Sequence, residues 1–119
     1  MSAPKIVVVT GANNGIGYET VKAFLQSDKA YHIYLGSRST ENGKVALGKL
    51  REEVPGATNA VELLPLDLTS DQSIDSAFEQ IKSGPGRVDI LINNAGASII
   101  SLTLPSSTTY ISPLRENRY

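Results

Sequence analysis

The feature that most restricts the fold of this chain is a short apolar run that leads directly into a glycine-rich turn. Residues 6–10 are a continuous β-branched run, too short for a helix and typical of a strand buried on both faces of a parallel sheet. Residues 11–17 are rich in Gly and Asn, and apolar side chains then recur at helical spacing to about Ser27. This order predicts the first strand–turn–helix unit of an α/β fold.

The same alternation continues along the chain. Further strands are expected at residues 31–35, closed by Gly36, and at residues 61–66 and 88–92. Ser39 or Thr40 is expected to begin a second helix that stops at Pro55, and Ser70 a third that stops at residues 84–86. Short connections and right-handed crossovers then predict a Rossmann-like, doubly wound parallel sheet.

Composition excludes several classes of function. The 12 acidic and 11 basic residues nearly cancel, which argues against nucleic acid or an anionic membrane as the main partner. There is no cysteine and one histidine, His32, so disulfides, thiol nucleophiles and multi-histidine metal sites are not expected. No apolar stretch approaches the roughly 20 residues of a membrane span, and the N-terminus lacks a signal-peptide pattern. We therefore expect a cytoplasmic protein.

The composition changes after Gly96. The remaining residues are rich in Ser and Thr, contain two prolines and show no helical periodicity. Residues 99–104 alternate weakly and could form a strand, but no covering element is expected after them. We therefore expect an incomplete nucleotide-binding domain over residues 1–97, ending after about the fourth strand, and a separate tail over residues 98–119.

The glycine-rich turn is the first candidate binding site. Backbone N–H groups of such a turn approach a phosphate closely, and the following helix directs its positive end there. The alternative is a plain tight turn, which three glycines in seven residues make less favourable. The candidate residues are Gly11, Asn13, Asn14, Gly15, Ile16 and Gly17.

The second candidate lies where dinucleotide-binding folds place their ribose-reading residue, about 20 residues beyond the glycines. An Asp or Glu there would bind the ribose 2′-hydroxyl of NAD, but this chain has Ser37 followed by Arg38. A guanidinium is a planar, charged donor suited to a 2′-phosphate. This pair predicts NADP(H) rather than NAD(H), against the alternative of a solvated surface arginine.

Two further candidates follow the third and fourth expected strands. Asp67, beside Leu68, could accept a hydrogen bond from an adenine amino group, because α/β folds bind ligands at the carboxyl ends of their strands; a turn aspartate is the alternative. Asn93, Asn94, Ala95 and Gly96 suit close approach of backbone to ligand, and a generic turn is the alternative.

Together these four segments resemble the short-chain dehydrogenase/reductase family, and more narrowly its NADP(H)-dependent, carbonyl-reductase-like members. The matching segments are residues 10–17, 37–38, 67–70 and 93–96, in family order over residues 5–97. The resemblance implies that the glycines shape the pyrophosphate loop with Ile16 against the cofactor. It also implies that Arg38 binds the 2′-phosphate, that Asp67 contacts adenine, and that residues 93–96 brace the sheet and touch the cofactor ribose.

The sequence departs from the family after its fourth strand. Family members continue with three more strands, a catalytic Ser and a Tyr-x-x-x-Lys pair, in which Tyr donates a proton and Lys lowers its pKa. Here Tyr110 is followed at that spacing by Leu114, and no lysine follows Lys82. No catalytic residue is therefore assigned.

The main expectation is thus an NADP(H)-binding fragment of an oxidoreductase without activity of its own, with carbonyl substrates belonging to full-length relatives. The alternative is a non-catalytic dinucleotide-binding or regulatory module that pairs with another protein. An exposed edge on the fourth strand would also favour self-association.

Overall fold

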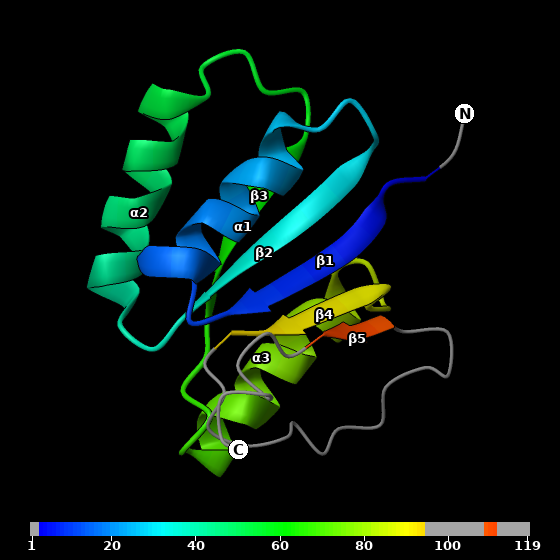
Figure 1. The fold of residues 1–119 in the computed structure, drawn as a ribbon. Helices are drawn as coiled ribbons and strands as arrows, with labels where there is room; N and C mark the ends of the chain where they lie inside the picture. The colour runs from blue at the N-terminus through cyan, green and yellow to red at the C-terminus, as the bar shows by residue number, and fades with distance from the viewer. Residues whose placement is uncertain (1–2, 95–108, 112–119) are drawn as a thin grey trace, which may run out of the picture.

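The computed structural model describes residues 3–94 and 109–111, which form a five-stranded sheet with the strand order β3-β2-β1-β4-β5 (Figure 1). Each pair of neighbouring strands is parallel. The strands are β1 (Lys5–Thr10), β2 (Tyr31–Ser37), β3 (Ala60–Pro65), β4 (Ile90–Asn93) and β5 (Thr109–Ile111).

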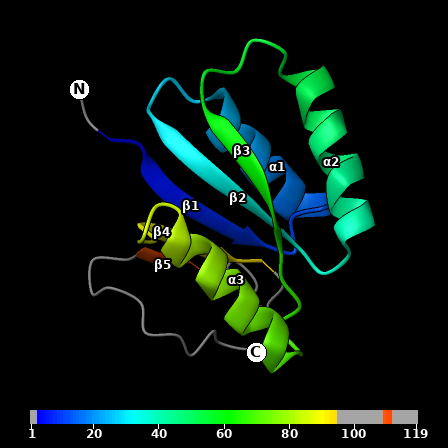
Figure 2. The same cartoon turned by 180° about the vertical axis from the view of Figure 1, so that it is seen from behind.

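Three helices cover the two faces of the sheet in the described part of the chain. They are α1 (Gly15–Gln26), α2 (Thr40–Glu53) and α3 (Asp71–Ser83). Figures 1 and 2 show α1 and α2 on one face and α3 on the other. Ser39 and Ser70 cap α2 and α3 through their side chains, because each hydroxyl accepts a backbone N–H that the first turn leaves without a partner. The predicted doubly wound α/β fold is confirmed.

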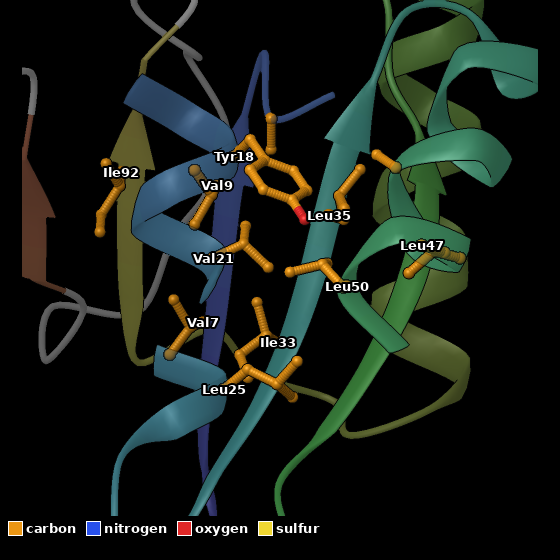
Figure 3. Close-up of a cluster of buried hydrophobic side chains, with 12 residues drawn as sticks. Val7, Val9, Tyr18, Val21, Leu25, Ile33, Leu35, Leu47, Leu50 and Ile92 are labelled. Carbon is orange, nitrogen blue, oxygen red and sulfur yellow. The ribbon is translucent and has the colours of Figure 1, made fainter. Parts of the chain in front are cut away.

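Strand β1 is buried on both faces because successive side chains point in opposite directions. Val7 and Val9 belong to the cluster under α1 and α2, whereas Ile6 and Val8 belong to the cluster under α3. Figure 3 shows Val7 and Val9 beside side chains of α1 and β2. The β-branched run of residues 6–10 is thus the centre of the sheet, as the sequence predicts.

Gly36 lies inside β2 and does not end the strand, which corrects the sequence prediction. A Cβ built on Gly36 would lie 2.7 Å from the carbonyl oxygen of Val9 and 3.2 Å from the Cα of Thr10. The glycine therefore permits a close approach of the two backbones, and the Gly36 carbonyl accepts a hydrogen bond from the Ala12 N–H at 2.8 Å. The strand continues to Ser37, where the predicted site begins.

The edge of β4 is paired, which corrects a second expectation. β4 begins at Ile90, two residues later than predicted, and pairs with β5 through the positions Ile90–Thr109, Leu91–Tyr110 and Ile92–Ile111. This strand lies within residues 98–119, where no covering element was expected. The open edge that was expected over Ile90 to Ile92 is therefore paired, whereas self-association stays a prediction. The strand considered at residues 99–104 lies outside the described residues.

Candidate functional site

The glycine loop between β1 and α1 requires glycine for two different reasons. Gly11 and Gly15 have φ values of 59° and 61°, a left-handed conformation that other residues adopt only with strain. Gly17 instead has no space for a side chain: a Cβ there would overlap the Gly11 carbonyl oxygen and lie 2.9 Å from the Cα of Ala12. The loop therefore has a defined backbone conformation that requires glycine at these three positions.

The first turn of α1 directs backbone N–H groups toward the open end of this loop. The first helical hydrogen bond runs from the Tyr18 N–H to the Asn14 carbonyl. The N–H groups of Gly15, Ile16 and Gly17 have no acceptor among residues 3–94 and 109–111. The first turn holds no acidic residue, and Ile16 is 62% exposed beside it. Such a helix start favours an anion.

Asn93 and Asn94 brace the loop from the neighbouring strand. The buried Asn93 Oδ1 accepts a hydrogen bond from the Thr10 hydroxyl at 2.9 Å. Asn94 Nδ2 donates to the Gly11 carbonyl at 3.1 Å. The bracing expected from the sequence is therefore present. Contact of this segment with a ribose stays a prediction, and Ala95 and Gly96 lie outside the described residues.

Ser37 and Arg38 at the end of β2 differ sharply in exposure. Ser37 is fully buried, and its hydroxyl donates to the Ser39 carbonyl oxygen at 2.7 Å. Its own carbonyl accepts the Leu66 N–H at 2.9 Å. Arg38 is exposed and has no hydrogen bond or ion pair with a described residue. In this arrangement Ser37 fixes the backbone, and the guanidinium of Arg38 is available to a ligand.

Asp67 follows β3 and is held by residues that sequence reasoning did not single out. Its Oδ1 accepts two hydrogen bonds from Thr69, at 2.6 Å from the hydroxyl and at 2.9 Å from the N–H. Its backbone N–H donates to the Ser73 hydroxyl at 2.8 Å. The Thr69 hydrogen bonds lower the pKa of Asp67, and the positive charge of Arg38 adds to this effect. An Asp-x-Thr spacing before a helix is the signal that could have predicted this arrangement. The half-buried Leu68 packs beside the cluster under α3.

These segments meet at one end of the sheet because all of them follow the carboxyl ends of parallel strands. The strand order reverses between β1 and β4, and open α/β sheets bind ligands at such a reversal. The glycine loop and Asn94 lie at this point, while Arg38 and Asp67 follow the next two strands, β2 and β3. This end of the sheet therefore offers backbone donors for one anionic group, an exposed guanidinium, and a carboxylate with a lowered pKa.

One Tyr-x-x-x-Lys spacing does occur, at Tyr18 and Lys22 of α1, and sequence reasoning overlooked it. Tyr18 is buried in the core (Figure 3), and its hydroxyl donates to Oε1 of Glu53 at 2.6 Å. Burial and then Glu53 raise the pKa of Tyr18 far above its ordinary value. Lys22 Nζ lies 3.3 Å from the same Glu53 oxygen. Tyr18 and Lys22 therefore connect α1 to α2 through Glu53. Tyr18 does not suit the role of a proton donor, because that role needs an accessible hydroxyl with a lowered pKa.

Other chemistry is not evident in the described residues. Residues 3–94 and 109–111 contain no group of three His, Asp or Glu side chains that could hold a metal ion. His32 lies in β2, which is paired on both sides, and its ring stacks on Tyr34 and contacts Glu62 of β3. None of the helices in the described part is long and apolar enough to cross a membrane.

The fold and this end of the sheet define the chain as a Rossmann-like α/β protein with a glycine-rich loop between its first strand and first helix. A family model described as short chain dehydrogenase matches residues 5–111, so the chain belongs to the short-chain dehydrogenase family of oxidoreductases. The match extends into the tail and includes β5.

Similar proteins agree with this family. The chain is 39% identical over 99 residues to a short-chain dehydrogenase/reductase of Talaromyces stipitatus, covering 83% of this chain and 37% of the relative. The menthone neomenthol reductase of Mentha piperita is 33% identical with a TM-score of 0.68, over 80% of this chain and 32% of the reductase. The L-sorbose reductase of Gluconobacter frateurii, solved with NADPH and L-sorbose, is 28% identical with a TM-score of 0.67, over 85% of this chain and 36% of that one. The chain thus spans roughly a third of the length of these relatives.

Proposed function

We propose that this chain binds NADP(H) and forms the cofactor-binding part of a reductase that transfers a hydride between NADPH and a carbonyl compound. The observation that carries the proposal is the exposed Arg38 directly after β2, which makes no hydrogen bond or ion pair with a described residue and follows Ser37 at the position where a carboxylate would read an NAD ribose. A guanidinium suits a 2′-phosphate, whereas a carboxylate there would repel it. The NADPH in the solved L-sorbose reductase supports the choice of cofactor.

Titrating NADPH and NADH against three proteins tests this proposal. We expect the wild type to bind NADPH more tightly, and Arg38→Ala to lower NADPH affinity about tenfold, with NADH affinity unchanged. Arg51→Ala is the matched control, because Arg51 is an exposed arginine in the last turn of α2. Equal affinities of the wild type for the two cofactors would refute the NADP(H) assignment.

We further propose that the 119 residues bind the cofactor without reducing a carbonyl compound. Reduction of a ketone needs a proton at the developing alkoxide, and general acid catalysis typically contributes about 10²- to 10⁴-fold. The sequence has no lysine after Lys82, and Tyr18 is buried and committed to Glu53. The assay is NADPH oxidation with ketones, aldehydes and quinones against a heat-inactivated control. Saturable turnover that disappears in Tyr110→Phe would overturn this part of the proposal.

A further inference from the structure

The chain contains two Asn-Gly pairs, Asn14-Gly15 and Asn42-Gly43. Asn-Gly is the dipeptide most prone to deamidation, because a glycine nitrogen reaches the preceding side-chain carbonyl without hindrance from a Cβ. The reaction requires that the glycine N–H can lose its proton and that the backbone can rotate into a five-membered ring. The two pairs differ in both requirements.

The Asn14-Gly15 pair meets both requirements at the cost of one helix-end hydrogen bond, which runs from the Tyr18 N–H to the Asn14 carbonyl at 3.2 Å. Both residues are exposed, and the Asn14 side chain makes no capping hydrogen bond to α1. The Gly15 N–H has no acceptor within residues 3–94 and 109–111. A Cβ built on Gly15 would meet no atom within 4 Å, so there is open space on that side of the residue.

The Asn42-Gly43 pair meets neither requirement. The Gly43 N–H donates to the Ser39 carbonyl at 2.9 Å in the first turn of α2. Gly43 is buried, and a Cβ there would overlap the Leu63 side chain and lie 3.1 Å from the Cβ of Ser37. Ring closure at Asn42 would break a helical hydrogen bond and push the backbone into β2 and β3.

We propose that Asn14 is a deamidation site that disables the glycine loop. The Gly15 nitrogen, after losing its proton, attacks Cγ of Asn14 and forms the new N–C bond of a succinimide. The Cγ–N bond of the amide breaks, and ammonia leaves with the proton. Water then opens the ring to aspartate or isoaspartate. The balance is one water consumed and one ammonia released, with no oxidant or reductant.

The functional consequence rests on the proposed NADP(H) function. Either product carries a negative charge at the loop that is proposed to hold the cofactor diphosphate, and isoaspartate also lengthens the loop backbone. An aspartate at the N-cap of α1, the position of Asn14, is compatible with the helix, because its negative charge interacts favourably with the positive helix end. The aspartate form therefore stays folded but binds NADPH more weakly. Bound NADPH protects Asn14, because the phosphate engages the same N–H groups.

Incubation of the full chain in mildly alkaline buffer, followed by trypsin and mass spectrometry, tests the site itself. The peptides of residues 6–22 and 39–44 separate Asn14 from Asn42, and fragmentation separates Asn14 from Asn13. We expect deamidation at Asn14 well before Asn42, and similar rates at both residues when the chain is unfolded in urea. Equal rates in the folded chain, or an intact Asn14, would overturn the proposal.

The affinity for NADPH tests the consequence. We expect the incubated wild type to lose affinity several-fold in proportion to Asn14 conversion, with its melting temperature retained in the fraction containing aspartate. Asn14→Gln should keep through incubation whatever affinity it has at the start. Unchanged affinity after full conversion would overturn the consequence. The fresh protein separates the two proposals: if it fails to bind NADPH, the proposed function fails, whereas the contrast between Asn14 and Asn42 needs no cofactor.

Discussion

The Nδ2 of Asn94 lies 3.1 Å from the carbonyl oxygen of Gly11 and donates a hydrogen bond to it across 83 positions of sequence. This contact ties the end of β4 to the glycine loop between β1 and α1. Gly17 lies against the same two groups, because a Cβ there would overlap the Gly11 oxygen and lie 2.8 Å from Asn94 Nδ2. The loop, the start of α1 and the end of β4 thus form one packed unit.

Gly17→Ala should therefore destabilise the protein. The atoms that the new methyl group would meet include the backbone of Gly11 and Ala12, which cannot move without disturbing β1, so we expect a loss of about 2–3 kcal/mol in the free energy of unfolding. Gly48→Ala is the matched control, since Gly48 is an exposed residue of α2 with open space around it. It should stabilise the helix by about 0.5–1 kcal/mol. Denaturant unfolding measures both, and a Gly17→Ala variant as stable as the wild type would contradict this packing.

Thr69 should position Asp67 for adenine recognition. Thr69 holds Oδ1, and Oδ2 accepts no hydrogen bond from a described residue, so Oδ2 is the oxygen available to the adenine amino group. We expect the wild type to prefer NADPH over its hypoxanthine analogue, which has a carbonyl in place of that amino group. Thr69→Val should reduce this preference about threefold, whereas Thr58→Val, at an exposed threonine outside the site, should not change it. A preference unaffected by Thr69→Val would exclude the positioning role.

The order of elements was predictable because it depends on local patterns, whereas the binding roles of the four site segments stay predictions. The β-branched run of residues 6–10 and the capping residues Ser39 and Ser70 act within a few positions of themselves. Gly36 was misassigned because it resembles a turn residue, and only the closeness of Val9 shows that it permits backbone contact inside a strand. The three-residue strand β5 has no periodicity of its own, since pairing with β4 defines it.

The side chains that hold the site could not be predicted because their partners lie far away in the sequence. Ser37 looked like a ligand by its position, but burial and the Ser39 carbonyl occupy its hydroxyl. Tyr18 is buried in the core, and its hydrogen bond to Glu53 joins residues 35 positions apart. Packing in three dimensions decides the roles of Ser37 and Tyr18, and the spacing of residues in the sequence does not show which residues pack together.

Asn59 organises the turn between α1 and β2 at the opposite end of the sheet, where the parallel strands begin. Its Nδ2 donates to the carbonyls of Phe24, Ser27 and Lys29 at 3.0, 3.2 and 2.9 Å. Its Oδ1 accepts the Tyr31 N–H at 3.1 Å. One side chain thus bonds four backbone groups, and it does so with both its donor and its acceptor.

Asn59→Asp should destabilise the protein by about 2–3 kcal/mol, because an oxygen would face three carbonyl oxygens and lose their hydrogen bonds. Asn42→Asp is the control with the same change of charge. Asn42 is exposed in the first turn of α2, where a negative charge interacts favourably with the helix dipole. The stability of the Asn42→Asp variant should therefore equal that of the wild type or be slightly higher. Thermal unfolding at neutral pH compares them, and equal melting temperatures would show that Asn59 does not hold the turn.

Asp89 joins the strands β1, β4 and β5 at that same end of the sheet. Its Oδ2 accepts the Ile6 N–H at 2.7 Å and lies 3.0 Å from Nε of Arg87. Its backbone N–H donates to the Ile6 carbonyl, and its carbonyl accepts the Thr109 N–H. Burial would raise the pKa of Asp89, but the Ile6 N–H and the Arg87 guanidinium more than offset it and hold that pKa below its ordinary value.

The lowered pKa gives the stability a defined pH dependence. A carboxyl group whose pKa is lower in the folded than in the unfolded chain stabilises the fold above the unfolded value, here 3.8, and this contribution is lost as the pH falls through the folded value. Asp89→Asn keeps an acceptor but removes the charge, so at neutral pH we expect a loss of about 1 kcal/mol. The difference from the wild type should shrink in acid, because the wild-type carboxyl is then also neutral. Asp75→Asn, at an exposed aspartate of α3, should have little effect at either pH. Denaturant unfolding at neutral and acidic pH measures these differences in the free energy of unfolding. If the difference between Asp89→Asn and the wild type stays constant into acid, the charge of Asp89 does not stabilise the junction of β1, β4 and β5.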